Sequence, residues 1–165
     1  MKFEIRKLHK LCGKRVTVYS IVWNDEETTL FERFILENKD DYPKELTDLR
    51  NQINVIANST GIRENFFEKP EGKLGQDVWA LFDHRKRRLR LYCMQLGRVV
   101  IILGGGGPKN TRTLQEDPKL KSENNLMRTV SDALTQRIMD KEIWWTDDEL
   151  AGNFLFDDED MNDDE

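Results

Sequence analysis

The sequence predicts a single α+β domain in which helices are layered on one β-sheet. A β-hairpin pattern at the N-terminus is followed by two helical patterns, then by three strand patterns, and then by one long helical pattern. Strands and helices that occur in such runs, without strict alternation, are typical of the α+β class. The length of 165 residues suits one domain with at most an appendage.

The first two strand patterns predict a hairpin. Residues 2–6 alternate charged and apolar side chains, with Phe3 and Ile5 on one face, which indicates a half-buried strand. Residues 15–23 are rich in β-branched and aromatic side chains and predict a second strand. A turn at residues 12–14, which include a glycine, connects the two.

Two helices are expected next. Asn24 and Asp25 are expected to cap the first helix, whose apolar stripe includes residues 30–35. Pro43 is expected in the first turn of the second helix, where its missing N–H would have no partner. Gly61 is expected to close that helix. We interpret both apolar stripes as core contacts.

Three further strands are predicted over residues 78–82, 89–94 and 99–103. Their connections are too short for crossovers, so the strands should form an antiparallel meander. Residues 99–103 carry no polar side chain, which predicts a central strand buried on both faces. Four glycines, residues 104–107, follow this strand and allow the backbone to bend sharply.

The C-terminal part divides into a helix, an arm and a tail. Pro118 is expected to begin a third helix that reaches about Asp140. Residues 141–156 contain two tryptophans and two phenylalanines, and we interpret them as an aromatic arm that docks on the body or on a partner. We therefore expect a body over residues 1–140, an arm over 141–156 and a disordered acidic tail over 157–165.

The tail dominates the net charge of −5. Residues 157–165, DDEDMNDDE, carry seven acidic side chains, and without them 24 acidic residues stand against 26 basic ones. The tail either keeps the protein soluble or covers a basic surface of the body. Under the second interpretation, deleting residues 157–165 should tighten RNA binding at low salt.

Several function classes are excluded by residue usage. The chain has two histidines and two cysteines, Cys12 and Cys93, without metal-ligand spacing. It has no G-x-S-x-G motif, and Pro108 interrupts the glycine run where a phosphate-binding loop requires lysine. No apolar run approaches the roughly 18 residues of a membrane span. We expect a cytoplasmic protein with no metal, no cofactor and no membrane partner.

Basic residues at one predicted hairpin are the strongest chemical feature. They are His84, Arg85, Lys86, Arg87, Arg88 and Arg90, with Lys109 and Arg112 after the adjacent strand and Lys69 and Lys73 before the meander. Arg90 and Tyr92 are two residues apart and should share one face of their strand. Arg and Lys on such a face suit a phosphodiester backbone, and Tyr92 could stack on a base. For residues 85–87, the alternative is a solvated turn without a ligand.

Residues 63–113 resemble the RelE/HigB-like toxins of bacterial type II toxin–antitoxin systems, in particular the phage Gp49-like branch. The resembling segments are Lys69-Pro70-Glu71-Gly72, Val78-Trp79-Ala80-Leu81, Leu89-Arg90-Leu91-Tyr92, Val99-Val100-Ile101-Ile102-Leu103 and the Gly-x-x-Lys-x-x-x-Thr spacing of residues 106–113. The upstream helix order agrees, and the resemblance spans about residues 14–140.

The resemblance implies a ribosome-dependent mRNA endonuclease that works without a metal ion and is neutralised by a small antitoxin, which could be a helix-turn-helix protein. Arg90 and Lys109 match an arginine and a lysine of the family and would stabilise the charged phosphorane. His84 or Tyr92 would move protons. The RNA-binding candidates are Lys69, Lys73, Arg85, Lys86, Arg87, Arg88 and Arg112.

Two departures from the family pattern keep an alternative open. Phe82 stands where the branch often has arginine, and Asn110 stands where it often has a second lysine. The alternative is a non-catalytic module that uses the same basic surface to bind RNA, the ribosome or an acidic protein segment.

Overall fold

A computed structural model describes residues 1–68, 78–84, 86–109 and 117–157 of the chain. Within these residues it confirms the α+β class, with three α-helices and a mostly antiparallel sheet of seven strands. The helices are α1 (Leu30–Asn38), α2 (Pro43–Val55) and α3 (Pro118–Met139).

The seven-stranded sheet has the order β3-β4-β5-β6-β2-β1-β9. Its strands are β1 (Lys2–Lys7), β2 (Thr17–Trp23), β3 (Phe67–Glu68), β4 (Trp79–Phe82), β5 (Leu89–Leu96), β6 (Val100–Pro108) and β9 (Leu155–Asp157). The expected hairpin is β1–β2, and the expected antiparallel meander is β4–β5–β6. The hairpin and the meander join through a parallel pairing of β2 with β6, which the sequence analysis did not predict.

The central position predicted for residues 99–103 is confirmed. β6 lies between β5 and β2, with β4 beyond β5 on the same side. The strand continues through Gly104–Gly107 to Pro108, so these glycines belong to the sheet instead of following it. The register of β6 against β5 shifts between Leu91 and Cys93, which indicates a β-bulge beside the glycines.

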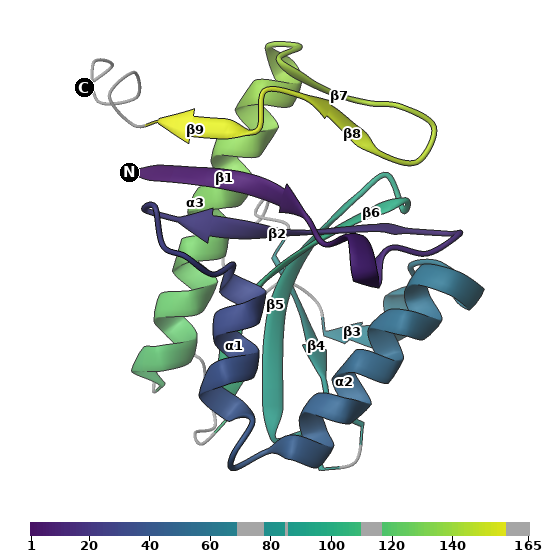
Figure 1. Cartoon of the computed structure of the whole chain (residues 1–165), viewed down its shortest axis with the longest axis vertical. Coiled ribbons are helices and arrows are strands. Elements are labelled where there is room, and N and C mark those ends of the chain that lie inside the picture. The colour runs from purple at the N-terminus through teal and green to yellow at the C-terminus, as the bar shows by residue number, and fades with distance from the viewer. Residues whose placement is uncertain (69–77, 85, 110–116, 158–165) are drawn as a thin grey trace.

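Helices cover both faces of the sheet, so the expected single helical layer is replaced by two (Figure 1). On β6, Val100 and Ile102 pack in one buried cluster with α3, whereas Ile101 and Leu103 pack in a second cluster with α1 and α2. Successive side chains of a strand point to opposite faces, so this division follows directly from the strand period. It explains why residues 99–103 have no polar side.

The helix boundaries follow local signals, with one correction. The α1 helix is capped by Thr29, whose side chain accepts from the Glu32 amide in a capping box, and not by Asn24 or Asp25. Those two residues have positive φ and form the turn before it. Pro43 and Pro118 each stand in the first turn of a helix, as predicted. Gly61, with φ of 72°, follows the π-helical turn that ends α2.

The aromatic segment after α3 is integrated into the fold. Strands β7 (Ile143–Trp145) and β8 (Leu150–Gly152) form a separate hairpin, and β9 adds to the edge of β1. The Phe156 ring stacks on the Phe3 ring with centroids 4.2 Å apart. Residues 141–156 were expected to dock on the body or on a partner, and the structure shows them docked on the body.

Candidate functional site

The candidate site is built on β5 and the two strands beside it toward the β3 edge. Phe82 of β4 lies opposite Arg90, and Gly107 of β6 lies opposite Arg90 on the other side. Residues directly opposite one another on paired strands share a face, as do residues two apart on one strand. Glu68 of β3 lies opposite Ala80, two residues before Phe82. The register therefore places Glu68, Phe82 and Arg90 on one face of the sheet.

Arg90 is buried and ion-paired at this position. Arg90 is 1% exposed, and its Nη2 lies 2.6 Å from Glu68 Oε2. Its guanidinium carbon also lies 5.0 Å from the centroid of the Phe82 ring, at cation–π range. A guanidinium keeps its charge in a protein, so the Glu68 carboxylate balances part of the Arg90 charge at a position that little water reaches.

A pocket of about 400 Å³ opens beside this ion pair. Its walls are Asn65, Phe66, Phe67, Glu68, Phe82, His84 and Arg87. The Arg87 guanidinium lies 5.2 Å from the Phe82 ring centroid, so two cations contact the same ring. The pocket thus combines aromatic rings, positive charge, one carboxylate and one imidazole.

A buried aspartate shapes the basic turn between β4 and β5. Asp83 is 0% exposed, and its carboxylate accepts from the amides of Leu89 at 2.7 Å and Lys86 at 3.1 Å. Arg87 has a φ of 53°, a left-handed conformation that reverses the chain. The turn is therefore held by specific bonds, and the side chains of Lys86 and Arg87 are exposed.

The basic run opens toward two hollows. Arg87 and His84 line the pocket beside Glu68, whereas Lys86 and Arg88 line a separate hollow with Lys44 and Glu45. The expected RNA-binding residues of this turn therefore do not all border one cavity. Arg85, together with Lys69, Lys73 and Arg112, lies outside the described residues.

The other catalytic candidates occupy different surroundings. Tyr92 is 1% exposed and belongs to the buried cluster under α3, and it does not line the pocket. Lys109 is exposed, and its amide donates to the Arg88 carbonyl at 2.8 Å. It follows Gly107 by two residues, so strand alternation favours the Arg90 face for its side chain. That Arg90 and Lys109 hold one phosphate between them stays a prediction.

Glu68, Phe66 and Phe67 were missed in the sequence analysis. Phe66 and Phe67 stand together in the polar stretch between the second helix and residues 78–82, where no strand was predicted. Two adjacent aromatic residues in a polar stretch were the available signal. A two-residue strand such as β3 is too short to show a period.

The described residues contain no group of three His, Cys, Asp or Glu side chains arranged for a metal ion. None of the helices described has the length and apolar character needed to cross a bilayer. Comparison of the chain with protein-family models, with curated proteins and with solved structures yields no match in any of the three.

Proposed function

We propose that this protein is an RNA-cleaving toxin similar to the RelE/HigB-like family, acting on mRNA at the ribosome and neutralised by a small antitoxin. One observation carries the proposal: the Arg90 guanidinium, the Phe82 ring and the Glu68 carboxylate meet beside a pocket that also contains His84 and Arg87. Arginine binds phosphate, and the half-buried Phe66 at the pocket offers a ring on which an unpaired base can stack, so the group suits single-stranded RNA.

The proposed reaction is transfer of a phosphodiester within the RNA. The ribose 2′-oxygen attacks the adjacent phosphorus, the bond to the 5′-oxygen breaks, and a 2′,3′-cyclic phosphate and a 5′-hydroxyl result. A base removes the 2′-proton, and an acid protonates the departing 5′-oxygen. Arg90 and Lys109 would stabilise the negative charge of the pentavalent phosphorane. In this proposal Glu68 acts as the base and His84 as the acid, because both line the pocket.

RNA binding without cleavage is the alternative function, and the ion pair favours it. Arg90 is 1% exposed and already bonded to a carboxylate, so a phosphate must displace Glu68 to reach it. Binding through the exposed Lys86, Arg87 and Arg88 alone needs no such rearrangement. Phe82 in place of the arginine often found in the branch agrees with this alternative.

The deciding experiment is cleavage of a reporter mRNA during translation in vitro, mapped by primer extension. We expect the purified protein to cut the mRNA in the presence of ribosomes. Arg90→Ala should reduce the cleavage rate roughly 10²–10³-fold, as expected for the loss of one charge-stabilising donor. Since Arg90 is buried, the exposed Lys109→Ala is the second variant, and Arg15→Ala at the opposite end of the sheet is the control.

Cosedimentation with ribosomes separates the two functions. Binding without cleavage would overturn the nuclease and support the binding module, whereas neither cleavage nor binding would overturn both. Expression in a bacterium adds a test of the toxin: growth should stop, and coexpression of a small neighbouring open reading frame should restore it. Cleavage that is unchanged in both Arg90→Ala and Lys109→Ala would refute the assigned site.

A further inference from the structure

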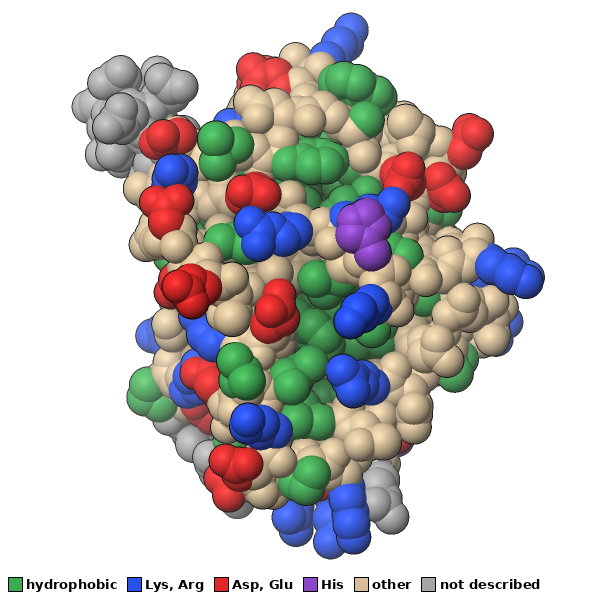
Figure 2. Space-filling model, viewed as in Figure 1, with side chains coloured by type: hydrophobic (Ala, Val, Ile, Leu, Met, Phe, Trp, Pro, Cys, Tyr) green, Lys and Arg blue, Asp and Glu red, His purple; other side chains and the backbone are tan. Residues whose placement is uncertain are grey.

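An apolar groove lies between α1, α2 and the 3-10 turn His9–Leu11, on the face of the molecule shown in Figure 2. It consists of two hollows of about 210 and 480 Å³, which share Phe31, Ile35 and Arg50 as lining residues. The shared side chains make the two hollows direct neighbours, and we treat them together as one groove. In Figure 2 hydrophobic side chains fill its floor, and lysine, arginine and histidine side chains border it.

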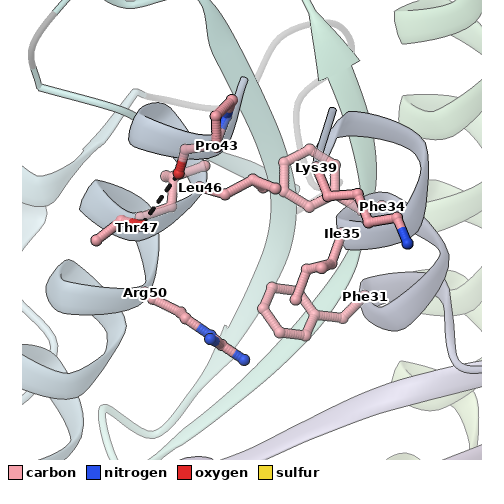
Figure 3. A pocket seen from close by; sticks show the side chains of 9 residues that line it. Phe31, Phe34, Ile35, Lys39, Pro43, Leu46, Thr47 and Arg50 are labelled. Carbon is pink, nitrogen blue, oxygen red and sulfur yellow. Dashed lines mark hydrogen bonds between the residues drawn. The ribbon is translucent and has the colours of Figure 1, made fainter. Parts of the chain in front are cut away.

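Apolar side chains from both helices form the wall of the smaller hollow. Phe31 and Ile35 of α1 face Leu46 of α2 across it (Figure 3). The larger hollow continues this wall with Leu8 and Leu11. Ile35, Leu46, Leu8 and Leu11 are only half-buried, so an added apolar surface would remove more of them from water.

The rim of the groove is strongly basic. Its lining includes Arg6, Lys7, Lys10, Lys39 and Arg50, with Glu32 as the one acidic residue among the lining residues described. Lys10, Lys39 and Arg50 are exposed and make no ion pair or hydrogen bond through their side chains with any described residue. Glu32 is engaged in the capping box of α1. Several positive charges at the groove therefore lack a carboxylate partner among these residues.

We propose that this groove binds an amphipathic α-helix of a partner protein, with apolar residues against Phe31, Ile35 and Leu46 and acidic residues against the basic rim. Helices bind such grooves through apolar anchors spaced i, i+3 or i+4, and i+7. Opposite charges around an apolar core set orientation and speed of association. The inference goes beyond RNA cleavage and stands whether or not the protein is a nuclease.

RNA fits this surface less well than a helix does. Single-stranded RNA binds through exposed aromatic faces and a track of cations. The one aromatic ring common to both hollows, that of Phe31, is 5% exposed, and the accessible wall is mainly aliphatic. The groove therefore favours a helix with apolar anchors over stacked bases.

The test uses the full-length protein and designed fluorescent peptides. One peptide of sixteen residues, a length we choose, carries leucine at helical anchor positions and glutamate elsewhere. A scrambled peptide of the same composition and a peptide with lysine in place of glutamate are the comparisons. By fluorescence anisotropy, we expect the acidic amphipathic peptide to bind at least about tenfold more tightly than either comparison, since only it matches both features.

Charge reversal locates the binding. The double variant Lys39→Glu/Arg50→Glu should weaken binding of the acidic peptide at least about tenfold and should bind the lysine peptide in its place. The double variant Arg15→Glu/Lys121→Glu changes the net charge equally at exposed positions outside the groove and should bind like the parent. Leu46→Ala, with its fold checked by circular dichroism, should also weaken binding.

Two outcomes would overturn the proposal. The first is equal binding of the acidic and scrambled peptides, or no binding of either, which would remove the requirement for an amphipathic helix. The second is a 12-nucleotide single-stranded RNA that binds more tightly than the peptide and loses that affinity in Lys39→Glu/Arg50→Glu. That result would assign the groove to nucleic acid instead.

Discussion

At the scale of single residues, the pairing of Arg90 with Glu68 decides how the candidate site can work. Arg90 is almost fully buried, whereas the Glu68 side chain is 42% exposed. The carboxylate can therefore leave and be solvated, but the guanidinium cannot. A ligand phosphate would replace one anion by another at a site that always requires one.

This asymmetry predicts unequal effects of removing the two partners. Glu68→Ala should lower the free energy of unfolding by roughly 1–2 kcal/mol, because it removes a carboxylate partner from a buried charge, with the partial exposure of Glu68 reducing the usual cost. Arg90→Met keeps most of the side-chain volume and leaves the Glu68 carboxylate, which water can reach. It should therefore lower the free energy of unfolding by less than Glu68→Ala does. Urea unfolding measures both, and an equal or reversed order would contradict this account.

The burial of the Cys93 thiol predicts that the protein becomes less stable at alkaline pH. Complete burial raises the pKa of its thiol above the usual value. The unfolded thiol ionises near pH 8.5, so the unfolded state loses its proton first. The contribution of Cys93 is therefore full below about pH 8.5 and falls by about 1.4 kcal/mol for each further pH unit.

Urea unfolding of the parent and of Cys93→Ala between pH 7 and pH 10 checks this prediction. Burial also raises the pKa of Tyr19, which contributes a loss of the same sign in both proteins and cancels in the comparison. The two stability curves should converge as the pH rises above 8.5. Parallel curves over the whole pH range would show that Cys93 does not contribute to the pH dependence of stability.

At the scale of elements, β6 combines a hydrophobic half with a glycine half. The half formed by residues 100–103 is buried between the helices of both faces, as its lack of polar residues predicts. In the glycine half, the absence of side chains lets neighbouring groups approach the backbone. A Cβ added at Gly106 would lie 1.9 Å from the Arg90 carbonyl oxygen, closer than atoms can pack.

Two alanine substitutions in this strand should differ sharply. Gly106→Ala should destabilise the protein by roughly 2–3 kcal/mol or more, because a β5 backbone atom must move. Gly107→Ala should be neutral or slightly stabilising, by up to about 1 kcal/mol, since its Cβ would lie 3.5 Å from Lys119 Cγ, an ordinary contact. Thermal unfolding monitored by circular dichroism compares them, and equal melting temperatures would refute the close approach at Gly106.

At the scale of the whole molecule, the charge is unevenly distributed between the body and the C-terminal residues. Residues 158–165 contain six of the 31 acidic residues, and removing them changes the formal net charge from −5 to +1. Asp157, which the sequence analysis assigned to the tail, is the last residue of β9 and pairs with Lys2 across the sheet edge. A deletion that leaves the sheet intact therefore begins at residue 158.

Deleting residues 158–165 should tighten RNA or ribosome binding at low salt. A tethered anionic segment competes for the basic surface at an effective concentration in the millimolar range. Each exposed contact contributes only a few tenths to about 1 kcal/mol, and screening over about 8 Å at 0.15 M salt should remove most of the difference. A tail of equal length with Asn and Gln in place of the acids is the control. Equal affinity of all three proteins at both salts would leave the tail a solubilising role.

Local signals in the sequence are enough to predict the class of the fold and most of its element boundaries. Pro43 and Pro118 begin helices, and residues 99–103 form a central strand, because proline geometry and side-chain period act within a few residues. The start of α1 was predicted at Asn24 and Asp25 because they are common capping residues, whereas Thr29 and Glu32 form the cap. The basic turn was also evident from residue types alone.

Which distant segments meet becomes visible in the folded chain alone. Glu68 pairs with Arg90 although 22 residues separate them, and β9 closes the sheet edge against β1 from the other end of the chain. The parallel contact of β2 with β6 and the groove between α1 and α2 likewise join segments that share no local pattern. Hydrophobic periodicity and capping residues depend only on neighbours along the chain. Contacts between distant segments depend instead on which sheet edges and helix faces remain to be covered when the elements pack.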